Sequence, residues 1–243
     1  MIDLHCHILP GIDDGASDLT ESLALLRLAV ADGITHMVAT PHINPGYFDN
    51  NHATIQQALL LLQQAAQTHG IPIQLSAAAE VRVTADLMIA VAQQQLPMLG
   101  QWQGQQVLLL EFPHSHIPPG SDKLVKWLLQ RNILPMIAHP ERNREVQADQ
   151  AVLNPFIRAG CLFQLTASSV LGDLGERHQA CAAVLLQQRL FTIMATDCHN
   201  LNRRPPKLAE AFRKVAALTD ESYANVLVNE HPLQIAQNLH FSA

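Results

Sequence analysis

The sequence predicts an α/β fold, a closed or nearly closed barrel of seven parallel strands that alternate with helices. Three observations support this prediction. Short runs of aliphatic and β-branched residues alternate with longer segments in which apolar residues have helical spacing. The strand runs are apolar throughout, which is typical of parallel strands covered by helices. The length of 243 residues suits one such barrel, and 48% hydrophobic with only 5% aromatic residues suits an aliphatic core.

The predicted elements alternate without interruption in the first part of the chain. Two of the helices end at a glycine, a residue that commonly closes a helix. The predicted strands are residues 2–7, 34–42 and 71–80, and the predicted helices are residues 19–33, 50–70 and 84–95.

The same alternation continues to the end of the chain, where the last segments are helical. The predicted strands are residues 105–112, 133–142, 161–168 and 190–199, and the predicted helices are residues 121–132, 150–160, 175–189, 205–218 and 232–239. No linker or low-complexity tract interrupts this order, so we expect a single domain over residues 1–243.

Composition excludes several classes of function. A formal net charge of −6 argues against a general nucleic-acid binder. No basic region followed by an apolar stretch opens the sequence, so a signal peptide is not expected, and the apolar stretches are too interrupted to predict a transmembrane helix. The four cysteines lack a CxxC pair, which favours free thiols in a reducing compartment over a disulfide scaffold. We therefore expect a cytoplasmic protein.

Residues that can bind metal ions lie at the ends of most predicted strands. The carboxyl ends of parallel strands in a barrel meet at one rim, so these side chains are expected to lie close together. They are His5, His7, Asp14, His42, Glu80, Glu111, His139, Asp197 and His199. Alternation along the first strand is also expected to point Asp3, His5 and His7 to one face.

Imidazole and carboxylate ligands without thiolates are typical of catalytic Mn, Fe or Zn sites. Nine such side chains exceed the needs of one ion, which favours a cluster of two or three ions with bridging carboxylates. Clustered cations can polarise a phosphoryl group, activate water at neutral pH and stabilise a leaving oxygen, so hydrolysis is the expected chemistry.

The motifs "MIDLHCH", "IDDG", "ATPH", "AAAE", "LLLEF", "IAHPER" and "ATDCHNLNRRPP" follow one another in the order found in a known family. At these residues the sequence resembles the polymerase-and-histidinol-phosphatase (PHP) family over essentially the whole chain. Within it, the sequence is most similar to the bacterial capsule and exopolysaccharide tyrosine-protein phosphatases of the CpsB/YwqE type.

This resemblance implies a distorted (β/α)7 barrel of the PHP type with three divalent metal ions. Manganese is the expected ion, with Fe, Zn or Mg as alternatives. His5, His7, Glu80 and Asp197 would hold one ion. Glu80 would bridge to a second ion, which Glu111 and His139 also hold, and the third ion would lie among Asp14, His42 and His199.

The resemblance also implies that Arg142 and Arg204 bind the substrate phosphate and stabilise the transition state. This agrees with the general ability of guanidinium groups to bind phosphate oxygens in a bidentate manner. The implied activity is a metal-dependent protein-tyrosine phosphatase. The implied substrate is the phosphotyrosine of a bacterial tyrosine kinase that regulates polysaccharide export.

Three alternatives remain open at this point. The chain could be a PHP phosphatase for a small molecule such as histidinol phosphate. It could be an amidohydrolase, although those enzymes usually have a carboxylated lysine where this chain has Glu80 and Glu111. It could also be a non-catalytic module, but none of the predicted ligands is missing. The sequence predicts neither the oligomeric state nor the general acid.

Two loops depart from the family pattern or add to it. The proline-rich loop after Glu111 carries His114 and His116, which we expect at the rim rather than among the metal ligands, where they could contact substrate. The loop after His42 carries Tyr47 and Phe48, which could stack on a phosphotyrosine ring.

One motif points to a different mechanism. Cys198 and Arg204 have the spacing of cysteine-dependent tyrosine phosphatases, but the residues between them include no glycine. A glycine-rich phosphate loop is therefore not predicted, and Cys198 is not expected to be the nucleophile.

Overall fold

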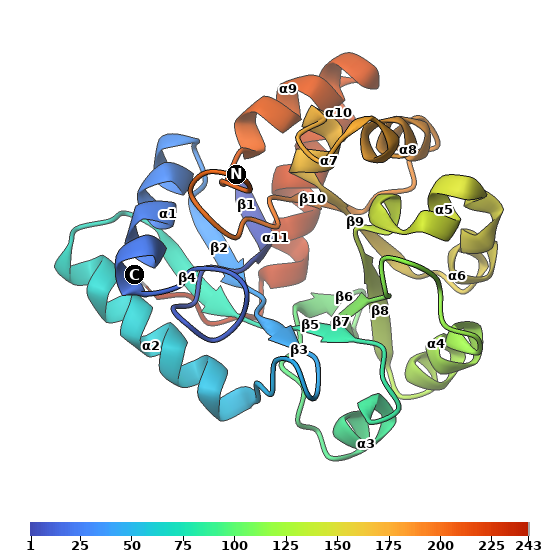
Figure 1. Cartoon of the computed structure of the whole chain (residues 1–243), viewed down its shortest axis with the longest axis horizontal. Coiled ribbons are helices and arrows are strands. Elements are labelled where there is room, and N and C mark those ends of the chain that lie inside the picture. The colour runs from blue at the N-terminus through green and yellow to red at the C-terminus, as the bar shows by residue number, and fades with distance from the viewer. Residues whose placement is uncertain (243) are drawn as a thin grey trace.

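The computed structural model describes residues 1–242, with strands at the centre of the molecule and helices around them (Figure 1). The strands in this part of the chain are β1 (Ile2–Cys6), β2 (His36–Ala39), β3 (His42–Ile43), β4 (Gln74–Ala77), β5 (Glu80–Arg82), β6 (Gly100–Trp102), β7 (Gln105–Glu111), β8 (Ile133–Ala138), β9 (Leu162–Thr166) and β10 (Ile193–Ala195).

The described strands form a barrel of seven parallel strands. In this count, β2 and β3 are taken as one bent strand, and so are β4 and β5. One sheet has the order β1-β2-β4, and the other has the order β10-β9-β8-β7-β5-β3. The two sheets meet between β1 and the end of β10, where the Asp197 amide donates to the His5 carbonyl at 2.8 Å and the His7 amide donates to the Cys198 carbonyl at 2.9 Å. The parallel barrel expected from the sequence is therefore confirmed.

The predicted strands 34–42 and 71–80 are each divided in two. Pro41 lies at the first break and has no amide hydrogen to continue the ladder. The two breaks lie side by side, because the Ala78 amide donates to the Ala39 carbonyl at 2.8 Å and the Glu80 amide donates to the Pro41 carbonyl at 3.2 Å. This shared bend places His42 and Glu80, which pair in register across β3 and β5, at the rim.

Strand β6 was not predicted from the sequence. It pairs with β7 in an antiparallel hairpin. The turn consists of Gln103 and Gly104, both with positive φ (51° and 83°), as a tight hairpin turn requires. Gly100, with φ of 130°, lies so close to α11 that a Cβ atom there would be 2.1 Å from the Ile235 carbonyl oxygen.

The predicted long helices are present, and the structure also contains short helices that were not predicted. Asp18 caps the first helix, and Asn51 with Thr54 forms a capping box on the second. No helix within residues 1–242 is both long and apolar enough to cross a membrane. The helices are α1 (Leu19–Ala31), α2 (His52–Thr68), α3 (Leu87–Ala92), α4 (Ser121–Leu129), η1 (Pro140–Arg142), α5 (Arg144–Ala148), η2 (Gln150–Leu153), α6 (Asn154–Arg158), α7 (Ala167–Leu171), α8 (Glu176–Gln187), α9 (Leu208–Leu218), α10 (Glu221–Asn225), η3 (Val226–Glu230) and α11 (His231–Ala236).

Two apolar layers hold the barrel together. The inner layer includes Leu4, Val38, Leu109 and Met136 from different strands, and Ile235 of α11 packs into the same layer. A larger outer layer lies between the strands and the surrounding helices. The interior is thus filled with side chains, as in other barrels, and the polar residues lie at the carboxyl ends of the strands.

Candidate metal centre

A β-bulge in β1 sets the direction of the first two candidate ligands. Asp3 pairs with Met37 and Cys6 pairs with Ala39, so β1 has one residue more than β2 between these pairs. Leu4 consequently packs in the inner apolar layer while Cys6 packs in the outer one. His5 and His7 lie side by side as expected, with their Nε2 atoms 3.3 Å apart.

The expectation that Asp3 shares this face is wrong, because the bulge breaks the alternation. The Asp3 carboxylate accepts hydrogen bonds from the backbone amide of Thr196 at 3.0 Å and from the Thr196 hydroxyl. It therefore ties β1 to β10 rather than facing the histidines.

Hydrogen bonds on the far side of three imidazoles decide which ring nitrogen faces the centre. The Nδ1 atom of His7 donates to Asp13 at 2.7 Å, that of His5 donates to Gln164 Oε1 at 2.9 Å, and that of His199 donates to the Asp197 carbonyl at 2.9 Å. Gln164 Oε1 also accepts the backbone amide of His139, which fixes that oxygen as an acceptor. In the neutral rings each Nε2 atom is thus an unprotonated lone pair, the state in which histidine binds metals.

Glu80 lies at the middle of the cluster. Its Oε2 atom is 3.2 Å from His5 Nε2, 3.4 Å from His7 Nε2 and 3.2 Å from His42 Nδ1. Its Oε1 atom is 2.8 Å from His139 Nε2. Oε2 is buried and has no hydrogen-bond partner among the described residues. A buried carboxylate oxygen of this kind is costly unless a cation neutralises it.

The remaining carboxylates extend the cluster toward the surface. Asp197 Oδ1 lies 3.5 Å from His5 Nε2 and 3.4 Å from His7 Nε2. Asp14 is half exposed, and its Oδ1 atom lies 3.4 Å from the Nε2 atoms of both His42 and His199. Glu111 Oε2 lies 3.8 Å from His42 Nδ1. All nine predicted ligands therefore converge on one region of the rim.

Ligand atoms gather in several small groups, within each of which they lie no more than 4.8 Å apart. The same histidines and carboxylates occur in more than one group, as expected where ions share bridging ligands. The groups are His7 with Asp14, His42 and His199; His5 with His7 and Glu80; His5 with His139 and Asp197; His42 with Glu80 and Glu111; and Glu111 with His114 and His139.

The pKa values of the carboxylates respond to their neighbours. Burial alone would raise the pKa of Asp197, but Arg204 and His5 hold it well below its ordinary value. Burial would likewise raise the pKa of Glu80, and His5 and His42 keep it well below. Burial and the adjacent Glu80 raise the pKa of Glu111 to about 7.

The imidazoles fall into two classes. Burial would lower the pKa of His7, yet Asp13 raises it well above its ordinary value. Burial and Arg142 lower the pKa of His139 to about 3, and burial and His7 lower that of His199 to about 4. A neighbouring carboxylate thus favours protonation of His7, whereas burial and a nearby positive charge disfavour protonation of His139 and His199.

Two arginines lie beside the cluster. Arg142, at the end of η1, and Arg204 both form ion pairs with Asp197 Oδ2. The Asn200 side chain accepts the backbone amides of Arg203 at 2.7 Å and Arg204 at 3.2 Å, which closes the loop that carries Arg204. The buried Arg204 Nε atom has no hydrogen-bond partner among residues 1–242.

The backbone is strained at two of the candidate ligands. His139 has φ of 30° and Asp197 has φ of 51°, in the left-handed region that non-glycine residues avoid. Such conformations cost about 1–3 kcal/mol each and are concentrated at functional sites.

The loop residues that the sequence singled out take different positions. His114 and His116 are both exposed. The His114 ring lies 5.3 Å from that of His139, centroid to centroid, whereas His116 bonds to Ser115 at 2.8 Å. Phe48 stacks on His42 with ring centroids 5.4 Å apart, and Tyr47 is 82% exposed.

Cys198 is completely buried in the outer apolar layer, opposite Cys6 on the neighbouring strand. Its side chain thus packs behind the cluster, although its neighbours Asp197 and His199 both contribute to it.

Sequence reasoning missed three residues that support the site. Asp13 and Gln164 orient imidazoles, and Arg82 contacts Glu111 Oε1 at 3.2 Å. Asp13 stands in the "IDDG" motif beside Asp14, which was a usable indication. Nothing local marks Gln164, because the residue it bonds lies 159 positions away.

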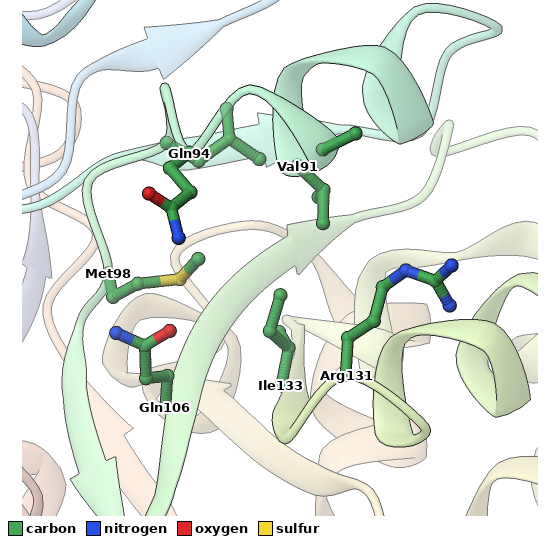
Figure 2. A pocket seen from close by; sticks show the side chains of 8 residues that line it. Val91, Gln94, Met98, Gln106, Arg131 and Ile133 are labelled. Carbon is green, nitrogen blue, oxygen red and sulfur yellow. The ribbon is translucent and has the colours of Figure 1, made fainter.

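A separate cavity of about 570 Å³ lies at the opposite end of the barrel (Figure 2). Gln106 and Ile133, at the starts of β7 and β8, line it together with Gln94, Met98 and Arg131. The described residues that line this cavity include none of the predicted site residues, so it is distinct from the metal centre.

The cluster fits divalent ions, because imidazole nitrogens face buried carboxylate oxygens, and one oxygen each of Glu80 and Glu111 has no hydrogen-bond partner among the described residues. A barrel with this cluster at its carboxyl-terminal rim, flanked by two arginines, defines a metal-dependent hydrolase. A family model described as "Capsular polysaccharide synthesis, CpsB/CapC" matches residues 1–237. The chain belongs to this family, which confirms the resemblance found in the sequence.

Individual relatives agree with this assignment. The tyrosine-protein phosphatase YwqE of Bacillus subtilis is 35% identical over 212 residues, which cover 87% of this chain and 82% of YwqE. The putative tyrosine-protein phosphatase CapC of Staphylococcus aureus is 31% identical over 238 residues, covering 95% of this chain and 92% of CapC.

A solved structure supports the same conclusion. It comes from crystallographic work on YwqE from Bacillus subtilis and CpsB from Streptococcus pneumoniae, described there as metal-dependent tyrosine phosphatases. It matches with a TM-score of 0.90 and 31% identity over 99% of this chain and 96% of the other.

Proposed function

We propose that this chain is a metal-dependent tyrosine-protein phosphatase of capsule or exopolysaccharide synthesis. The observation that carries the proposal is the cluster around Glu80, in which lone pairs of His5 and His7 face a buried and unpartnered carboxylate oxygen. Relatives that match over most of their length are named as tyrosine-protein phosphatases, and they indicate the class of activity.

Three divalent ions, with manganese as the expected metal, would be held by the nine ligands. The first ion would take His5, His7, Glu80 and Asp197; the second would take Glu80, Glu111 and His139; the third would take Asp14, His42 and His199. The group of His5, His7 and Glu80 supports the first site, and the group of His7, Asp14, His42 and His199 supports the third. For the second site, Glu80 Oε1 lies 2.8 Å from His139 Nε2, and Glu80 and Glu111 share a group with His42. When bound, such ions supply Lewis acidity toward the phosphoryl group and a nucleophile from water at neutral pH.

The protein's own residues bind and orient the substrate. Arg142 and Arg204 come from different loops and converge on one oxygen of Asp197, so both guanidinium groups point to the same place. A phosphate group beside that oxygen would accept hydrogen bonds from both arginines, and the unpartnered Arg204 Nε supplies a further donor. These charges would stabilise the equatorial oxygens as the tyrosyl oxygen departs.

The substrate we propose is a phosphotyrosine segment of a bacterial tyrosine kinase that controls polysaccharide export, encountered in the cytoplasm. The exposed Tyr47 and the stacked Phe48 lie in the loop next to His42 and would give the phenyl ring an apolar contact. Histidinol phosphate is the alternative substrate, and it would not need this contact.

The decisive experiment combines metal analysis with two substrates. Purified protein should contain divalent ions and should hydrolyse a phosphotyrosine peptide faster than histidinol phosphate. Chelation should abolish the activity, and manganese should restore it. Full activity after complete removal of metal would contradict the proposed function, and a preference for histidinol phosphate would contradict the proposed substrate.

A further inference from the structure

The loop of residues 113–117, between β7 and α4, contains a histidine that the mechanism above does not use. We propose that His114 is an additional ligand of the ion held by Glu111 and His139, an inference that rests on the proposed function. This would give that ion a set of two histidines and one carboxylate, besides the bridging Glu80. From the sequence alone, His114 was expected at the rim and not among the ligands.

His114 lies close to two of the proposed metal ligands. Ligand atoms of Glu111, His114 and His139 lie within 4.8 Å of one another, the same limit that joins the other groups of the cluster. The rings of His114 and His139 are tilted by 40° with centroids 5.3 Å apart. Both residues follow neighbouring strands, because Leu110 of β7 pairs with Ile137 of β8.

Hydrogen bonds hold the backbone around His114 in place. The His114 carbonyl accepts the Arg144 amide at 2.8 Å, and the Pro113 carbonyl accepts the Asn143 side chain at 2.8 Å. The Ile117 amide donates to the Glu145 carboxylate, also at 2.8 Å. Three bonds therefore clamp this loop to the segment that follows His139, and Pro113 restricts its backbone further.

The Glu111 carboxylate has an incomplete set of hydrogen-bond partners. Its Oε1 atom contacts Arg82 at 3.2 Å, while its buried Oε2 atom has no hydrogen-bond partner among the described residues. Glu80 is already shared with the histidines of β1. Glu80, Glu111 and His139 would thus give this ion three protein ligands, and His114 would fill a fourth position.

The chemistry of the added ligand has a consequence for metal choice. Imidazole suits iron, nickel, copper and zinc, whereas magnesium prefers oxygen ligands. His114 would therefore favour transition metals over Mg²⁺ at this position of the cluster.

His116 provides a matched control, since it is a histidine of the same loop that bonds to Ser115 and does not enter any group of ligand atoms. The experiment measures binding of Co²⁺ and Mn²⁺ to the full-length protein stripped of metal, using Co²⁺ absorption bands and Mn²⁺ electron paramagnetic resonance. The variants are His114→Ala, His114→Gln and His116→Ala, with circular dichroism to compare their folding.

We expect one class of site in both His114 variants to bind about 10- to 100-fold more weakly, with altered Co²⁺ bands, while His116→Ala matches the wild type. Isotherms and spectra unchanged in the folded His114 variants would overturn the inference. A raised KM for phosphotyrosine peptide with unchanged metal binding would also overturn it, because His114 would then contact substrate. Failure of the wild-type protein itself to bind these ions would instead overturn the proposed function.

Discussion

Asp13 controls how His7 faces the metal centre, and its removal should weaken the binding of metal. Its carboxylate accepts the Nδ1 hydrogen of His7 at 2.7 Å and the backbone amides of Gly15 at 3.0 Å and His42 at 3.2 Å. In Asp13→Ala the imidazole loses the partner that fixes its tautomer and raises its basicity. His42 loses one of its backbone anchors at the same time.

The size of the effect follows from the role of such partners. Carboxylates that orient a metal-binding histidine typically contribute about 10- to 100-fold to metal affinity. This corresponds to about 1.4–2.7 kcal/mol at 25 °C. Because the hydrogen bond is short, charged and almost fully buried, we expect Asp13→Ala to lie toward the upper end. Asp13→Asn keeps an acceptor oxygen without the charge and should lose less.

The assay is the dissociation constant for Mn²⁺, measured with chelator-buffered free metal on protein stripped of ions. Asp86→Asn is a matched control, since Asp86 is exposed and makes no capping hydrogen bond to α3. Circular dichroism should show that each variant is folded. A folded Asp13→Ala protein that binds Mn²⁺ within twofold of the wild type would refute the reasoning.

Four further outcomes are expected. Glu80→Ala should lose metal and activity while its circular dichroism is retained, and elemental analysis showing full metal content would remove Glu80 from the site. Arg142→Ala and Arg204→Ala should each lower kcat/KM for a phosphotyrosine peptide roughly ten- to hundredfold without loss of metal; unchanged kinetics would leave them as ion pairs only. Cys198→Ser should retain most activity and stay sensitive to chelators, whereas a folded, metal-loaded and inactive protein would favour a thiolate mechanism. Gly100→Ala should lower the free energy of unfolding by more than about 1 kcal/mol in urea melts, because its Cβ would collide with the backbone of α11; an unchanged midpoint would contradict the packing described.

The prediction of fold from sequence succeeded where the apolar periodicity was strong and failed at a short strand and at a break within a strand. The strands β7 and β8 and the helices α1, α2 and α8 were predicted within a few residues, since their apolar patterns are long. Strand β6 was missed because it has only three residues and contains a glycine. The division of the strand ending at His42 was also missed, although Pro41, which lacks an amide hydrogen, indicated a break at this point.

The sequence by itself determined which residue types end the strands, and hence the chemistry. Parallel strands around a barrel bring their carboxyl ends to one rim, so His5, Glu80, Glu111, His139 and Asp197 had to come near one another once the strand order was known. No distance was needed to reach this expectation, because it follows from the direction of the chain alone.

Only the tertiary structure decided how those residues are oriented. The bulge in β1 turns Asp3 away to Thr196, 193 residues later in the chain, and Gln164 fixes the tautomer of His5 from across the barrel. A side chain chooses its hydrogen-bond partner after the strands have paired, and the register of that pairing depends on packing throughout the barrel. Local sequence patterns therefore identify the candidate ligands, whereas the groups that hold them in place emerge only from the folded chain.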